Sequence, residues 1–79
     1  MTDIEFQLEL DAKGLMCPEP VMMLHKKVKE MAAGQVLKVL ATDPSTKRDI
    51  AKFCAFLSFE LIHDEEIEGV YGFYIKKPE

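Results

Sequence analysis

An apolar, strand-like segment is followed by an amphipathic helical segment twice in succession. Residues 6–10 alternate apolar and polar side chains, and apolar residues then recur every three or four positions from 18 to 33. The apolar run 36–41 is followed by a second amphipathic segment that ends near residue 58. Strands joined through a helix run parallel with a right-handed crossover, so we expect both helices on one face of the same sheet.

The first strand and helix have predicted boundaries. Phe6, Leu8 and Leu10 form the buried side of the strand, which residues 11–14 should end. The helix is predicted over Pro18 to Ala33, and Gly34 is the expected stop. The residues expected on its buried face are Val21, Leu24, Val28, Met31 and Ala32.

The second strand and the second helix are predicted from the same kinds of pattern. Residues 36–41 are almost continuously apolar, which indicates a central strand covered on both faces or nearly so. The helix begins either with Asp43 as N-cap and Pro44 as first residue, or two to three residues later at a capping box of Thr46 and Asp49. Its predicted inward stripe consists of Ile50, Phe53, Cys54 and Leu57.

Two further strands complete the chain. Residues 59–67 predict an irregular strand, Glu68 and Gly69 a turn, and residues 70–77 the partner strand of a hairpin. The predicted fold is therefore an α/β (α+β) two-layer sandwich of order β-α-β-α-β-β. It has a mixed four-stranded sheet, two helices on one face, and a single domain over residues 1–79.

Composition excludes several classes of function. The chain is 48% hydrophobic and 30% charged, which is typical of a folded domain. Its formal net charge of −4 argues against direct nucleic-acid binding, which requires clustered Lys and Arg. No apolar run approaches the roughly 18 residues of a membrane span, and no leader pattern is visible, so we expect a cytoplasmic protein without membrane contact.

Cys17 stands directly before Pro18, at the start of the first predicted helix. Proline is favoured at the first helical position, which predicts Cys17 at or beside the N-cap. The helix dipole and unpaired amides there favour an anion, and thiols in such positions commonly have a lowered pKa. We therefore expect a nucleophile near neutral pH; the alternative is a small thiol tucked under a loop.

The remaining candidates for chemistry are few. Cys54 is expected to pack in the core, since it shares the inward stripe of its helix. His25 lies about 12 Å along the helix from Cys17 at 1.5 Å per residue, too far for a direct base, and His63 is expected at the surface. Without a His base for Cys17 no hydrolase is predicted, and because the Cys and His residues lack metal-ligand spacing no metal site is predicted.

A contact surface is predicted beside the thiol. Met22, His25 and Lys29 share one flank of the first helix, where an exposed Met beside cations suits protein docking. Phe56 lies off the inward stripe of the second helix, so it either anchors a partner or packs against the last strand. Asp43 is expected at the same sheet edge as Cys17, with helix capping as its simplest role.

The segments CPEPVMM, ATDPSTKRDI and FCAFLSFEL resemble the TusA/SirA-like sulfur carrier family across most of the chain. The resemblance implies that Cys17 carries sulfane sulfur as a persulfide, with no other cofactor, and that Gly14, Pro18 and Pro20 shape its loop. It implies partner contacts at a set of surrounding positions. These are Glu19, Met22, His25, Lys29, Asp43 and Phe56.

The implied partners are a cysteine desulfurase or rhodanese-like sulfur donor and a downstream acceptor protein. The implied destination of the sulfur is 2-thiolation of the tRNA wobble uridine. Sulfur oxidation and molybdenum-cofactor assembly remain alternatives within this family. A regulatory interaction module whose cysteine is incidental is the alternative of a different class.

Overall fold

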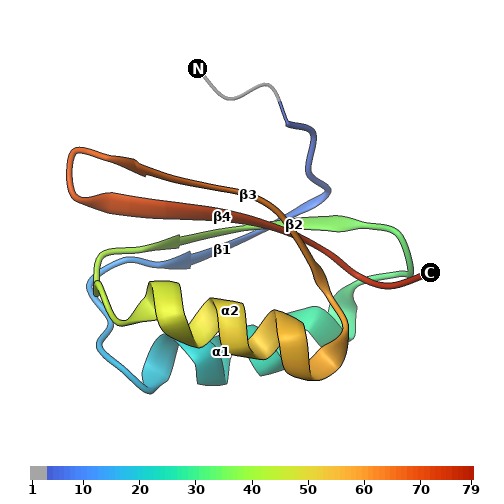
Figure 1. Cartoon of the computed structure of the whole chain (residues 1–79), viewed down its shortest axis with the longest axis horizontal. Helices are drawn as coiled ribbons and strands as arrows, with labels where there is room; N and C mark the ends of the chain where they lie inside the picture. Colours follow the sequence, from blue (N-terminus) through green and yellow to red (C-terminus); the bar gives the residue numbers. More distant parts are fainter. Residues whose placement is uncertain (1–3) are drawn as a thin grey trace.

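A computed structural model describes residues 4–79 of the chain, and its element order is the predicted one. The elements are β1 (Leu8–Ala12), α1 (Glu19–Lys27), the 3-10 turn η1 (Val28–Glu30), β2 (Val36–Ala41), α2 (Thr46–Leu57), β3 (Glu60–Ile67) and β4 (Val70–Lys76). The four strands form one sheet in the order β1-β2-β4-β3. Both helices lie on the same face of this sheet, so the α+β sandwich is confirmed (Figure 1).

The sheet combines parallel and antiparallel pairs. β1 and β2 are parallel, whereas β4 runs antiparallel to both β2 and β3. Parallel neighbours end at the same edge, so the loops that follow β1 and β2 emerge side by side and lead into α1 and α2 (Figure 1). This edge is where the candidate site is built.

The central strand β2 is covered on one face only, which corrects the prediction of two covered faces. Leu37, Val39 and Ala41 have no exposed surface and point toward the helices. Lys38 and Leu40 alternate with them and stay half-exposed on the other face, which carries no helix and is called the open face below. Both helices lie on the same side, so buried and half-exposed residues alternate along the strand although its sequence is almost continuously apolar.

The prediction for Phe6 was wrong, and β1 both starts and ends later than expected. The Gln7 side chain accepts the Val36 N–H at 2.8 Å, so the regular ladder begins only at Leu8. Phe6 is 39% exposed, and its ring centroid lies 6.2 Å from that of Tyr74 on the open face. The strand then continues through Asp11 to Ala12.

Helix α1 is shorter than predicted. It ends at Lys27, continues for one 3-10 turn, and becomes extended at Met31. The Lys77 ammonium donates to the carbonyl oxygens of Val28 at 3.2 Å and Met31 at 2.9 Å. These bonds satisfy carbonyls at the end of the helical segment, which stops before Gly34. Ala32 is consequently exposed and was wrongly placed on the buried face.

Helix α2 begins at Thr46 with Ser45 as its N-cap residue, so neither predicted cap is formed as expected. Thr46 is buried and, among residues 4–79, its Oγ1 has no hydrogen-bond partner, which rules out the capping box. The inward stripe is confirmed, with Ile50, Phe53 and Cys54 buried.

The hairpin of β3 and β4 matches its prediction. Glu68 and Gly69 have positive φ values of 51° and 81°, as a two-residue hairpin turn requires, and β3 is irregular between Leu61 and His63. His63 lies half-exposed on the open face beside Tyr74. Among the described residues, 4–79, no helix has the length and apolar character needed to cross a membrane.

We predict that Lys77→Met lowers the free energy of unfolding by about 1–3 kcal/mol, because two helix-end carbonyls lose a charged donor. Urea unfolding followed by circular dichroism measures this. Lys76→Met is the matched control, since the Lys76 ammonium lies 3.8 Å from the exposed Glu79 carboxylate and should contribute little. Equal loss of stability in the two variants would contradict the capping role.

Candidate functional site

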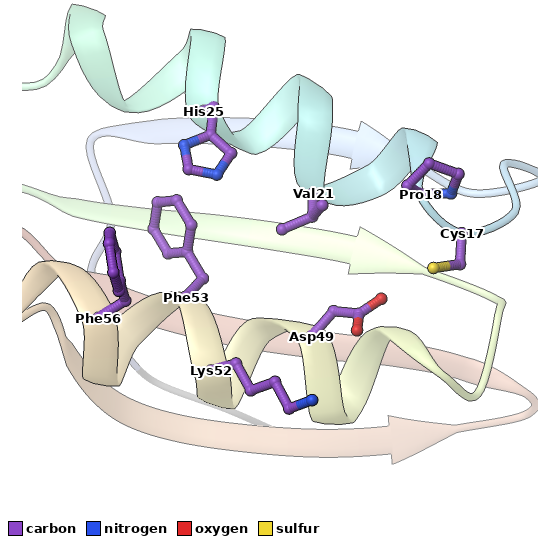
Figure 2. A pocket seen from close by; sticks show the side chains of 8 residues that line it. All are labelled: Cys17, Pro18, Val21, His25, Asp49, Lys52, Phe53 and Phe56. Carbon is purple, nitrogen blue, oxygen red and sulfur yellow. The ribbon is translucent and has the colours of Figure 1, made fainter.

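A groove of about 450 Å³ opens between α1 and α2 at the edge of the sheet where β1 and β2 end (Figure 2). Its lining comes from three parts of the chain. The residues are Cys17 and Pro18 from the loop after β1, Val21 and His25 from α1, and Asp49, Lys52, Phe53 and Phe56 from α2. Most of this lining is apolar, and the thiol lies at one end of the groove (Figure 2).

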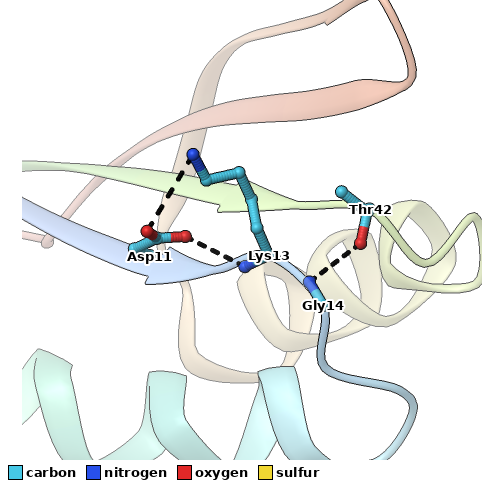
Figure 3. A network of polar contacts seen from close by, with 4 residues as sticks. All are labelled: Asp11, Lys13, Gly14 and Thr42. Atoms are coloured by element: carbon cyan, nitrogen blue, oxygen red, sulfur yellow. Dashed lines mark hydrogen bonds and ion pairs between the residues drawn. The ribbon is translucent and has the colours of Figure 1, made fainter.

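Polar contacts hold the loop between β1 and Cys17 (Figure 3). The Lys13 N–H donates to Asp11 Oδ1 at 3.0 Å, and the Gly14 N–H donates to Thr42 Oγ1 at 3.0 Å. Gly14 has φ +82°, a conformation that residues with a side chain rarely adopt. The loop after β1 is thus attached to the loop after β2 before it reaches the cysteine.

Asp43 makes the second attachment between these loops. Its Oδ2 accepts the Cys17 N–H at 2.8 Å, and its Oδ1 accepts the Ser45 N–H at 3.0 Å and the Ser45 hydroxyl at 2.9 Å. These donors, with Cys17 first, lower the pKa of the Asp43 carboxyl. The predicted proximity of Asp43 to Cys17 is confirmed, and the carboxylate positions the cysteine backbone.

The Cys17 thiol is exposed, so the alternative of a thiol tucked under a loop was wrong. Cys17 lies directly beside the N-cap, as predicted: Pro18 is the N-cap rather than the first helical residue, and the Cys17–Pro18 peptide bond is cis. Pro18 and Pro20 carry no N–H, and the Glu19 N–H donates to the Met16 carbonyl at 2.9 Å. The start of α1 therefore offers the sulfur few free donors.

The lowered thiol pKa expected from the helix end is contradicted. Asp49 raises the pKa of Cys17 above its ordinary value, because its carboxylate accepts a hydrogen bond from the thiol. Desolvation and the negative charges of Asp49 and Asp43 act in the same direction, while the Ser45 hydroxyl opposes them. The pKa-raising effect of Asp49 and Asp43 is therefore larger than any lowering by the start of α1, where two prolines lack N–H donors.

Aromatic side chains form the floor and far end of the groove. Phe53 is 4% exposed, and the His25 ring meets it edge to face at a centroid distance of 4.9 Å. Phe56 is 84% exposed, so it does not pack against the last strand and stays available for a partner. Met16 and Met22 are likewise exposed, at 74% and 56%.

The predicted strip of Met22, His25 and Lys29 is divided by the structure. His25 turns into the groove, whereas Met22 and Lys29 stay exposed outside its lining, as does Glu19. Pro20 is buried in the first turn of α1. Sequence reasoning assigned no role in the site to Asp49, Lys52, Val21 and Phe53. The spacing of 49, 52, 53 and 56 on one side of a helix was the available signal.

Cys54 lies in the core at 5% exposure, as predicted, and burial raises its pKa to about 11. A buried thiol with a raised pKa is unreactive, so Cys54 is not a candidate for the chemistry of the site. Among residues 4–79, no three His, Cys, Asp or Glu side chains are grouped closely enough to hold a metal ion.

Comparison with known proteins gives consistent matches. A family model described as "Sulfurtransferase TusA" matches residues 8–77. A protein of Pseudomonas entomophila (strain L48) named "Sulfur carrier protein TusA" is 62% identical over 77 residues, 98% of this chain and 96% of the relative. One of the same name from Pseudomonas syringae pv. syringae is 61% identical over 69 residues, 87% and 82% of the two chains. The crystal structure of a SirA-like protein from Desulfitobacterium hafniense has a TM-score of 0.80 at 27% identity, covering 92% of this chain and 100% of that one.

We predict that iodoacetamide modifies Cys17 alone in the folded protein, with a pH midpoint above the ordinary thiol value of about 8.5. The carboxylates beside Cys17 raise its pKa, and burial protects Cys54. Mass spectrometry of peptides after timed alkylation measures both. Modification of Cys54 without urea, or a Cys17 midpoint near neutral pH, would contradict this description of the site.

We predict that Asp43→Ala lowers the urea midpoint of unfolding at pH 7, because one hydrogen bond between the loops and two within the loop after β2 are lost. The folded-state pKa of Asp43 is below its unfolded value, so its contribution is present above about pH 4 and is lost as the pH falls through the folded value. The difference between wild type and variant should therefore shrink in acid. Asp64→Asn on β3 is the control, and a difference independent of pH would refute the linkage.

Proposed function

This chain belongs to the TusA family of sulfurtransferases, and from that premise we propose that it carries sulfane sulfur as a persulfide on Cys17. The observation that supports this most directly is the placement of an exposed thiol at the end of an apolar groove. A carrier needs a sulfur that two different proteins reach in turn. An exposed cysteine on a short loop meets that need.

The proposed loading step is an exchange at sulfur. The Cys17 thiolate attacks the outer sulfur of a persulfide on the donor protein, the bond between the two donor sulfurs breaks, and a bond to Cys17 Sγ forms. The donor cysteine leaves as a thiolate and takes up the proton that Cys17 lost. One thiol and one persulfide are present before and after the step, so no external oxidant or reductant is required.

The position of the second cysteine supports storage of the persulfide. A thiol close to the persulfide would attack it, form a disulfide and release the outer sulfur as sulfide. Cys54 points into the core from the inward side of α2 and is buried. The carried sulfur therefore meets no competing thiol of its own chain.

A carrier exchanges sulfur with a donor and an acceptor protein. The proposed donor is a cysteine desulfurase or a rhodanese-like protein, and the acceptor is the next protein of a sulfur relay. Exposed Met16 next to Cys17 in the chain, Met22 on α1 and Phe56 at the far end of the groove (Figure 2) supply apolar contact area for docking. Further partner contacts are proposed at Glu19, His25, Lys29 and Asp43.

The proposed destination is 2-thiolation of the wobble uridine of tRNA, in the cytoplasm. The net charge of −4 supports a route in which the acceptor protein, rather than this chain, contacts the RNA. Sulfur oxidation and molybdenum-cofactor assembly are the alternative destinations. Purified acceptor proteins from each route, tested for transfer from loaded carrier, would distinguish them.

We predict that incubation with a cysteine desulfurase and cysteine adds about 32 Da, one sulfur atom, to the wild-type protein under nonreducing conditions. Intact-protein mass spectrometry measures this gain. Cys54→Ser should gain the same mass, and Cys17→Ser none. Equal loading of Cys17→Ser would refute Cys17 as the carrier. If partner binding survives in Cys17→Ser and wild type gains no sulfur, an interaction module replaces the carrier.

A further inference from the structure

Asp49 lies on α2 directly across from the Cys17 sulfur, with its carboxylate turned toward it (Figure 2). The side chain is half-buried. Lys52 lines the same groove, yet within residues 4–79 no Lys, Arg or His lies within the 4.0 Å ion-pair distance of Asp49. A carboxylate without a cationic partner thus stands beside a thiol that has to meet other proteins.

This arrangement is unfavourable for sulfur transfer as it stands. The thiolate form of Cys17 and the anionic persulfide of a donor would both be repelled by the Asp49 carboxylate. Asp43 adds a second negative charge from the loop, while His25 and Lys52 are the basic groups that face the groove from α1 and α2. Something must neutralise Asp49 when the donor arrives.

We propose that Asp49 is a positioning residue that holds the Cys17 S–H by hydrogen bonding until a cationic side chain of the sulfur donor engages its carboxylate. This inference rests on the proposed carrier function and names the chemistry of the partner that the site accepts. Arginine fits best, because its guanidinium pairs with a carboxylate through two parallel hydrogen bonds. The overall charge of −4 favours approach of a cationic surface.

The electrostatics of Cys17 agree with this placement. Hydrogen bonding to Asp49 is the main reason that the thiol pKa lies above its ordinary value. When a donor cation pairs with Asp49, the carboxylate releases the S–H and its repulsion of the thiolate is offset. The proton then leaves Sγ for solvent, Sγ takes the outer sulfur, and the donor thiolate takes up a proton. The free protein is protected from unrelated electrophiles by the same carboxylate.

The test compares Asp49→Asn with wild type in two measurements. Iodoacetamide alkylation of the free protein should become severalfold faster at pH 7 in the variant, and its pH midpoint should move lower. Loading by a cysteine desulfurase should slow between low and high salt in wild type, because salt screens the donor cation, and should slow markedly less in the variant, which lacks the carboxylate that this cation engages.

Two further variants separate the specific charge from general effects. Glu60→Gln removes one negative charge at the opposite end of the sheet, where Glu60 lies opposite Lys76 in the β3–β4 ladder, and should behave as wild type. Asp49→Glu keeps the charge and should restore the salt dependence. Circular dichroism of each variant checks that the fold is retained.

The outcomes distinguish this inference from the function on which it rests. If Asp49→Asn is alkylated with the wild-type pH profile, or if its loading slows with salt as much as that of wild type, the role of Asp49 is refuted. If wild type takes up no sulfur at all, the carrier function itself is refuted, whatever the alkylation of Asp49→Asn shows.

Discussion

The Asp43 carboxylate connects the two loops on which the site depends. It accepts the Cys17 N–H with one oxygen and two Ser45 donors with the other, so the cysteine loop and the start of α2 are held as one unit. This is possible because parallel β1 and β2 end at the same edge of the sheet. These contacts fix the cysteine loop at one end of the groove between α1 and α2, which is where the thiol lies.

The thiol is accessible and restrained at the same time. Pro18 and Pro20 remove N–H donors from the start of α1, and the Asp49 carboxylate on α2 raises the pKa of the thiol. An exposed cysteine with a lowered pKa would react with any electrophile it met, whereas this arrangement favours reaction within a complex. The features that resemble activation in the sequence, a cysteine and prolines at a helix start, therefore act against it.

Most of the fold follows from local patterns. The period-two and period-3.6 repeats located every strand and both helices, and they placed Leu24, Val28, Ile50 and Phe53 in the core, because burial of an apolar face is decided by spacing. Boundaries failed where a distant residue intervened. Lys77 caps the carbonyls where the helical segment after α1 ends, and the Gln7 side chain bonds Val36 where a regular ladder would otherwise extend β1 toward Phe6. Lys77 is more than forty residues from the carbonyls it bonds, and Gln7 is twenty-nine residues from Val36, so neither contact was visible beforehand.

By itself, the sequence determined the two-layer architecture, the choice of Cys17 over Cys54, and the common edge of Cys17 and Asp43, since each follows from periodicity, from proline at a helix start, or from strand direction. Only the tertiary structure decided how reactive that thiol is. Asp49 is thirty-two positions further along the chain, and its carboxylate reaches the sulfur only when α2 packs beside α1. Electrostatic influence depends on distance in space, which the order of residues does not state.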